Sequence, residues 1–138
     1  MPKPPLRPEL DEFLSQPNPS VIATLAPDGS PHTAATWYLW ENGRVLVNMD
    51  EGRKRLDYLR NDPRVSITVL GKDDWYRHVT LRGRVVVIDE DALDDIDRIS
   101  RHYIGQPYPQ RDRGRVSAWI EVATWHAWAG GGPWTESD

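Results

Sequence analysis

The chain has 138 residues, no cysteine and a formal net charge of −4 at pH 7. The lack of cysteine excludes disulfides, thiolate metal ligands and a cysteine nucleophile, and the acidic balance argues against a nucleic-acid partner, which needs a basic face. No stretch reaches the roughly 20 apolar residues that cross a bilayer, and no apolar run typical of a signal peptide follows the N-terminus. We therefore expect one soluble, cytoplasmic domain over residues 1–138, with no membrane partner.

The first half of the chain predicts short strands separated by tight turns. Residues 1–8 are expected to be a flexible leader, and a short helix over residues 9–14 is closed by prolines. Turns are indicated at Pro27-Asp28-Gly29, where glycine accepts a positive φ, and at Asn42-Gly43. The strands that these turns separate are predicted over residues 20–25, 31–40 and 45–49. Two tight turns between three strands predict an antiparallel meander.

The second half alternates longer strands with two helices. The helices are expected over residues 53–61 and 89–103, where apolar residues recur at helical spacing. Gly83 interrupts one strand pattern and indicates a bulge or a barrel corner. The strands of this half are predicted over residues 65–70, 75–88 and 115–125, before a flexible tail at 129–138. About six strands without βαβ alternation predict a mainly β fold, an antiparallel barrel with short helices.

Familiar catalytic devices are missing from the sequence. There is no phosphate-binding glycine loop and no nucleophile elbow, and the histidines are too far apart for metal-ligand spacing. We therefore predict no metal site and name no catalytic residue. Seven tryptophans, in contrast, are many for a chain of this length. They serve packing in the simplest interpretation, but several together can also wall a pocket for a flat, conjugated ligand.

A basic cluster, Arg53-Lys54-Arg55, lies at the start of the predicted second helix. Free N–H groups and the positive end of the dipole make a helix N-terminus a binding site for phosphate. Cations are unfavourable at that end, so three of them together suggest that they serve a bound anion. A solvated basic surface is the alternative, and the spacing leaves both interpretations open.

The order of these motifs resembles that of the split-barrel flavoproteins of the pyridoxamine-phosphate-oxidase-like superfamily. The resemblance extends from Leu10 to about Trp128. The segments that carry it are Ala23-Thr24-Leu25, Pro27 to His32, Trp37, Arg53-Lys54-Arg55, Leu59 to Ser66 and Val79 to Val85. It implies an FMN-binding-like split β-barrel that forms a homodimer, with each cofactor in a groove at the dimer interface.

The resemblance also implies roles for individual residues. Arg53, Lys54 and Arg55 become contacts of the cofactor phosphate. His32, Thr36 and Trp37 would lie beside the ring system of the cofactor, and Asn48 would lie near its ribityl chain. Trp75 and Tyr76 would close the groove, either in the same subunit or from the partner subunit.

The sequence departs from the family pattern in two places, and these departures bear on the expected function. The chain ends in a glycine-rich tail where pyridoxamine-phosphate oxidases continue into a longer segment that holds their substrate. It looks more like the short branch that uses the deazaflavin coenzyme F-420, although Asp57-Tyr58 stands where that branch has Arg-Asn. The expected function is hydride transfer from reduced F-420 to a small conjugated acceptor such as a quinone, enone or nitro-aromatic compound.

Three alternatives remain open at this stage. The first is an FMN-dependent oxidoreductase of the same fold. The second is a non-catalytic carrier of flavin, deazaflavin or haem, and the third is an interaction domain that binds no small molecule.

Overall fold

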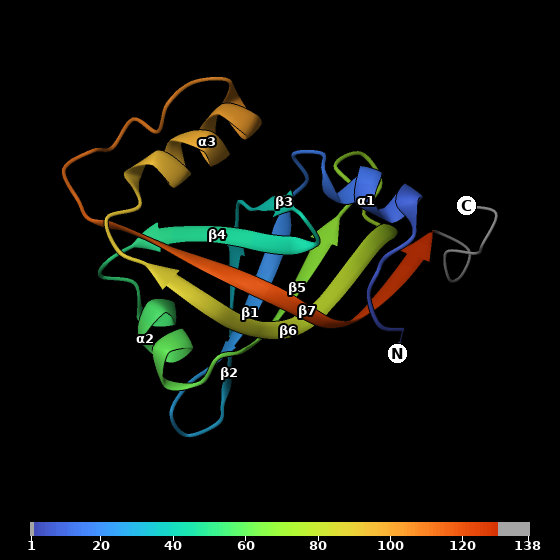
Figure 1. Ribbon diagram of the computed structural model, residues 1–138, viewed down its shortest axis with the longest axis horizontal. Helices are drawn as coiled ribbons and strands as arrows, with labels where there is room; N and C mark the ends of the chain where they lie inside the picture. The colour runs from blue at the N-terminus through green and yellow to red at the C-terminus, as the bar shows by residue number, and fades with distance from the viewer. Residues whose placement is uncertain (1, 130–138) are drawn as a thin grey trace.

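A seven-stranded antiparallel sheet forms the framework of residues 2–129, the part of the chain that the computed structural model describes. Its strands are β1 (Ser20–Leu25), β2 (Pro31–Thr36), β3 (Leu39–Glu41), β4 (Arg44–Asp50), β5 (Arg64–Leu70), β6 (Arg77–Asp89) and β7 (Arg115–Ala129). The helices are α1 (Pro8–Leu14), α2 (Lys54–Asn61) and α3 (Leu93–Ile104). The prediction of a mainly β, antiparallel fold with short helices is confirmed (Figure 1).

The strand order is β2-β1-β5-β6-β7-β4-β3, so that β2 and β3 are the two edges of the sheet. Only Trp37 and Tyr38 separate these edge strands in the sequence. Three steps between consecutive Cα atoms span at most about 11 Å, which requires the sheet to curl until its edges approach each other. We call this place the seam. The expected meander, with one strand over residues 31–40, is wrong, because the chain crosses the seam at Trp37 and Tyr38.

The side chains at the seam explain the break in the strand. Tyr38 is 1% exposed in the core, and its hydroxyl donates a hydrogen bond to the Leu14 carbonyl at 2.7 Å. Its neighbour Trp37 packs instead on the ring of Tyr103 under α3, with ring centroids 5.1 Å apart. Consecutive side chains of a strand point to opposite faces. Packing both of these aromatic residues against different parts of the interior therefore ends β2 and redirects the chain.

The long strands β6 and β7 bend around the core (Figure 1). Their register shifts between Arg82 and Gly83 and again between Val85 and Val87. A Cβ atom at Gly83 would lie 1.8 Å from the Glu121 carbonyl oxygen of β7. The bulge expected at Gly83 is confirmed, and its physical cause is this close approach of the two backbones.

Two apolar clusters hold the helices on the sheet. Leu10 and Leu14 of α1 are fully buried with the main core, and α2 adds Leu56 and Leu59 to it. The second cluster joins α3 to β4 and includes Ile99, which is fully buried. No helix within residues 2–129 is long and apolar enough to cross a membrane.

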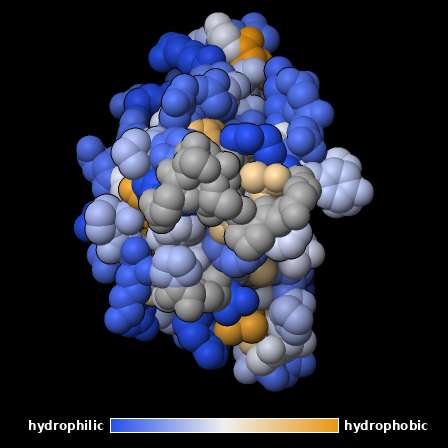
Figure 2. All heavy atoms as spheres, turned by 90° about the vertical axis from the view of Figure 1, so that its right-hand side faces the viewer, coloured by the Kyte–Doolittle hydropathy of each residue, from blue (hydrophilic) through white to orange (hydrophobic). Residues whose placement is uncertain are grey.

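The segment expected to be a flexible leader makes defined contacts with β7. The backbone N–H of Trp125 donates to the Pro2 carbonyl at 2.9 Å, and its indole donates to the Lys3 carbonyl at 3.3 Å. Leu6 is buried with the core. Figure 2 views the molecule from the right-hand side of Figure 1, where the described residues form a mainly hydrophilic surface with small separate apolar areas. The expected flexible tail, apart from residue 129, lies outside the described residues.

Candidate functional site

A cavity of about 650 Å³ opens beside the seam. Its walls come from the segment between α1 and β1, the end of β2, the end of β4, the turn before α2, one side of α3, the loop after α3 and the first residue of β7. Most of these segments are connections or strand ends, which the curling of the sheet brings together. The cavity has a cationic end and an aromatic end.

Three arginines, Arg53, Arg55 and Arg115, line the cationic end, and Lys72 of the β5–β6 loop is a further cation in the cavity wall. The Nε atom of Arg55 is buried and has no hydrogen-bond partner among the described residues. Burial, followed by the charges of Arg53 and Arg115, lowers the pKa of the Arg55 guanidinium. Within residues 2–129 no carboxylate lies at ion-pair distance from any of the three. Arg115 is buried, Arg55 is half-buried and Arg53 is exposed. Charges removed from water need a partner, so Arg55 and Arg115 favour an anion in the cavity.

Asp50 is the carboxylate that lines the same end of the cavity. It accepts a hydrogen bond from the Gly52 N–H at 2.8 Å and pairs with the Nε atom of Arg113 at 2.6 Å. The Gly52 hydrogen bond first, and then the nearby arginine charges, hold the pKa of Asp50 below its usual range. Asp50 is therefore ionised and already matched by Arg113, and the cavity keeps an excess of positive charge.

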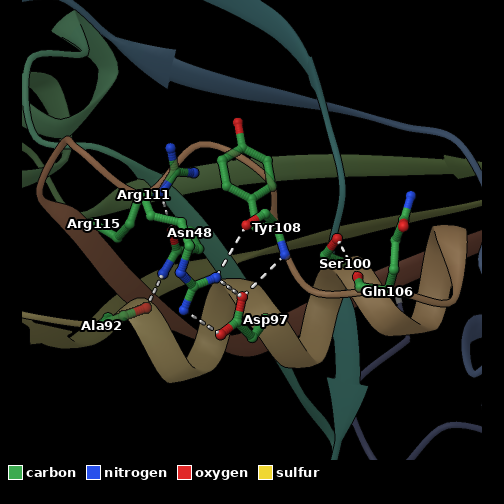
Figure 3. Close-up of polar contacts among 8 residues, drawn as sticks. All are labelled: Asn48, Ala92, Asp97, Ser100, Gln106, Tyr108, Arg111 and Arg115. Carbon is green, nitrogen blue, oxygen red and sulfur yellow. Dashed lines mark hydrogen bonds and ion pairs between the residues drawn. The ribbon is translucent and has the colours of Figure 1, made fainter.

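The loop between α3 and β7 is fastened by Asp97 (Figure 3). The Asp97 carboxylate accepts two hydrogen bonds from Arg111, at 2.9 and 3.0 Å, and one from the Tyr108 N–H at 3.0 Å. The Arg111 hydrogen bonds, with the Tyr108 bond as a smaller cause, hold the pKa of Asp97 below its usual range. This pairing places the Tyr108 ring over the Arg115 guanidinium, whose Cζ atom lies 4.8 Å from the ring centroid.

The aromatic end is formed by Trp37, Tyr103 and Tyr108. Trp37 and Tyr103 stack with an interplanar angle of 9°, and Tyr108 meets Trp37 edge-on at 6.4 Å. The Tyr103 hydroxyl donates to the Asn18 carbonyl at 2.6 Å, and burial raises the pKa of Tyr103 to about 12. Tyr103 is thus an uncharged wall residue at neutral pH, and this end suits a flat, conjugated ring.

The cavity brings together five of the nine residues expected in the site. These are Thr36, Trp37, Asn48, Arg53 and Arg55.

The other four residues do not line the cavity within this chain. Lys54 is exposed on the first turn of α2, and His32 packs edge-on against Tyr58 with centroids 5.5 Å apart. Trp75 and Tyr76 stack on each other at 4.3 Å and are 62% and 54% exposed. That Trp75 and Tyr76 close the groove of a partner subunit stays a prediction.

Sequence reasoning missed Arg115, Tyr103 and Tyr108. The two tyrosines fell within or just after a predicted amphipathic helix, where aromatic residues are expected to pack. Arg115 was recognised only as the start of a strand. No local pattern marks these residues, because α3 and the loop after it bring the two tyrosines to the seam and the pairing of β7 with β4 brings Arg115 there.

A curled antiparallel sheet with an arginine-lined cavity at its seam is the architecture of a split-barrel protein. Residues 6–129 match the family model described as pyridoxamine 5'-phosphate oxidase, and the chain belongs to this family. No curated protein gives a significant match.

Solved structures share the fold. An F-420 reductase superposes with a TM-score of 0.75 at 24% identity, covering 83% of this chain and 94% of the other. A conserved hypothetical protein from Mycobacterium tuberculosis gives 0.73 at 24% identity, with coverage of 94% and 88%. General stress protein 26 from Bacillus anthracis gives 0.63 at 18% identity, with coverage of 87% and 94%. These likenesses define the fold.

Proposed function

We propose that the chain is an oxidoreductase that binds the deazaflavin coenzyme F-420 in the cavity at the seam and reduces a small conjugated acceptor. The observation that supports this proposal most directly is the arginine cluster around Arg55, whose buried Nε atom has no protein partner among the described residues. A phosphate group satisfies it, because each phosphate offers several acceptor oxygens to arginine donors. The bound coenzyme supplies the hydride.

The cavity suits a cofactor that has an anionic tail and a planar ring. Its volume of about 650 Å³ lies within the range of about 300–1,000 Å³ that is usual for cofactor and ligand sites. Arg53 and Arg55 would hold the phosphate at one end, and Trp37 would lie against the ring at the other. The F-420 reductase among the structural neighbours supports this coenzyme. FMN, which has the same two chemical parts, is the alternative.

The residues of the cavity orient the reactants, and we assign no proton donor among them. Tyr103 has its pKa raised to about 12 by burial, and Asp50 is held ionised by Gly52 and Arg113. No histidine lines the cavity among the described residues. The protein therefore contributes binding, alignment and the exclusion of water, which together account for a large part of many rate enhancements.

Titration of the purified protein with F-420 and, separately, with FMN tests the proposal. Trp37 lines the cavity and should be quenched by a bound ring, so the fluorescence should saturate, and Trp37→Phe should remove most of the signal. Tight binding of F-420 with weak binding of FMN is the expected result. The reverse preference would assign the protein to FMN. Binding without reduction of any quinone, enone or nitro-aromatic compound would indicate a carrier, and binding of neither cofactor would refute the proposal.

We also propose that two copies of the chain form a homodimer. Large apolar side chains are exposed on the sheet and in the β5–β6 loop. They are Val21, Val86 and Val87 on the sheet, and Trp75 and Tyr76 in the loop. Such residues favour burial against a partner when they form one continuous area. Sedimentation equilibrium is expected to give twice the mass of the chain. A monomer that persists at all concentrations would contradict the dimer without affecting the cavity described here.

A further inference from the structure

Arg115 is a largely buried cation that forms no ion pair with a carboxylate of residues 2–129. It is the first residue of β7, lines the cavity and is 8% exposed. Its Nε atom has a protein partner, whereas no hydrogen bond joins its two Nη groups to any residue of 2–129. Asp50, the carboxylate whose pKa the charge of Arg115 helps to lower, is already paired with Arg113, so its attraction offsets only part of the cost of burying the guanidinium. Its free Nη groups therefore indicate a ligand acceptor inside the cavity.

The orientation of Arg115 is fixed by the side-chain amide of Asn48 on the neighbouring strand β4 (Figure 3). The Nε atom of Arg115 donates to Asn48 Oδ1 at 2.9 Å. The amide nitrogen of Asn48 donates to the Ala92 carbonyl at 3.0 Å and to Ser117 Oγ at 2.9 Å. Arginine can only donate and a carbonyl can only accept, so the amide has one possible orientation. Asn48 therefore has both donors engaged within the protein.

The hydrogen bonds continue from the cavity to the surface of α3. Ser117 Oγ accepts from Asn48 and donates its own proton to Asp95 Oδ2 at 2.7 Å. Asp95 is in turn bound by Arg98 at 3.2 Å. In this series of hydrogen bonds, the donors of Asn48 and Ser117 all have acceptors, so the network holds Asn48 in one rotamer.

Tyr108 completes the placement of Arg115. Its ring covers the guanidinium plane at 4.8 Å, and the Asp97–Arg111 pair anchors the loop that carries it. A guanidinium with one face covered and Nε engaged presents its Nη edge to a ligand. That edge matches the paired oxygens of a phosphate.

We propose that Arg115 contacts the anionic group of the ligand together with Arg53 and Arg55, and that Asn48 is the positioning residue that directs it. The ligand class is a phosphate-bearing molecule. Only its identification as F-420 or FMN rests on the proposed function. The expectation that Asn48 lies near the ribityl chain is thereby replaced, within this proposal, by a role exerted through Arg115.

The test compares ligands with and without phosphate. Arg115→Gln is expected to weaken FMN binding at least about tenfold, the loss of a charge-assisted hydrogen bond, and to leave riboflavin binding within about twofold. Asn48→Ala should produce the same selective loss with a smaller amplitude. Where the wild type binds only F-420, the same comparison uses F-420 and its deazaflavin core without the phosphate tail. Arg60→Gln, which removes a cation of α2 that pairs with Glu90 outside the cavity, is the matched control.

Equal losses for the two ligands would show a merely structural role and overturn the proposal, and so would unchanged affinities. Thermal stability in inorganic phosphate, measured against chloride at equal ionic strength, is the second readout and needs no cofactor. Phosphate should raise the Tm of the wild type and of Arg60→Gln, and Asn48→Ala should lose most of this increase. A wild type that binds phosphate but neither cofactor would refute the proposed function alone. The assignment of Arg115 would be overturned if phosphate raised the Tm of the wild type and of Asn48→Ala equally, or if it raised the Tm of neither.

Discussion

The double variant Arg53→Gln/Arg55→Gln is expected to lose at least about a hundredfold in affinity for the phosphate-bearing cofactor. Each charge-assisted hydrogen bond contributes about 1.5–3 kcal/mol, so the loss of two exceeds about 3 kcal/mol. Without ligand, the same variant should be as stable as the wild type or more stable. Burial and the charges of Arg53 and Arg115 already lower the pKa of Arg55, and cations at the start of α2 oppose its dipole.

Lys54→Gln is the control for this prediction. It removes a charge from the same segment, but Lys54 is exposed and does not line the cavity. Its cofactor affinity should stay within about threefold of the wild type, because exposed charges are screened by water and salt. Isothermal titration gives the affinities and thermal unfolding without ligand gives the stabilities. An effect of Lys54→Gln as large as that of the double variant would contradict the geometry of the site.

Gly83→Ala is expected to destabilise the fold by about 3 kcal/mol or more, at the upper end of what overpacking usually costs. The added Cβ atom would meet the Glu121 carbonyl oxygen at 1.8 Å and its carbon at 2.8 Å. Both atoms belong to the backbone of β7, so the clash cannot be relieved by turning a side chain. Because whole domains are stable by only about 5–15 kcal/mol, the urea midpoint should fall clearly.

Gly52→Ala provides the comparison. A Cβ atom at Gly52 would meet the flexible end of Arg113 at 3.2 Å, and Gly52 does not have a positive φ. Its unfolding free energy should change by less than about 1 kcal/mol, because alanine at a compatible position also restricts the unfolded chain. If urea denaturation gave the two variants the same stability, the close approach of β6 and β7 at Gly83 would be wrong.

Much of the fold follows from local patterns in the sequence. A run of residues that favour strands predicted the segment Ser20–Leu25 with its observed bounds, and Gly83 marked the bulge. The strand expected over residues 31–40 was wrong because Trp37 and Tyr38 are compatible with a strand by composition. What breaks it is the packing of Tyr38 against Leu14 and of Trp37 against Tyr103, and no local rule contains those contacts.

Only part of the candidate site could be predicted from the sequence. The basic cluster at residues 53–55 indicated an anion site, and the structure places Arg53 and Arg55, but not Lys54, in the cavity wall. Arg53 is the extended residue before α2, whereas Lys54 and Arg55 begin the helix, so the position of this boundary decides which of the three side chains face the cavity. Arg115 could not be found this way, since only the pairing of β4 with β7 places it beside Asn48.

The loop after α3 lines the cavity without being part of the sheet. The loop over residues 105–114 supplies Tyr108 to the cavity and forms no strand of the sheet. Changes in its length or sequence would therefore leave the hydrogen bonds between the strands intact, provided that Arg111 and Arg113 are kept to pair with Asp97 and Asp50. For protein engineering, this makes the sheet a reusable scaffold on which new ligand preferences can be selected by varying one surface loop.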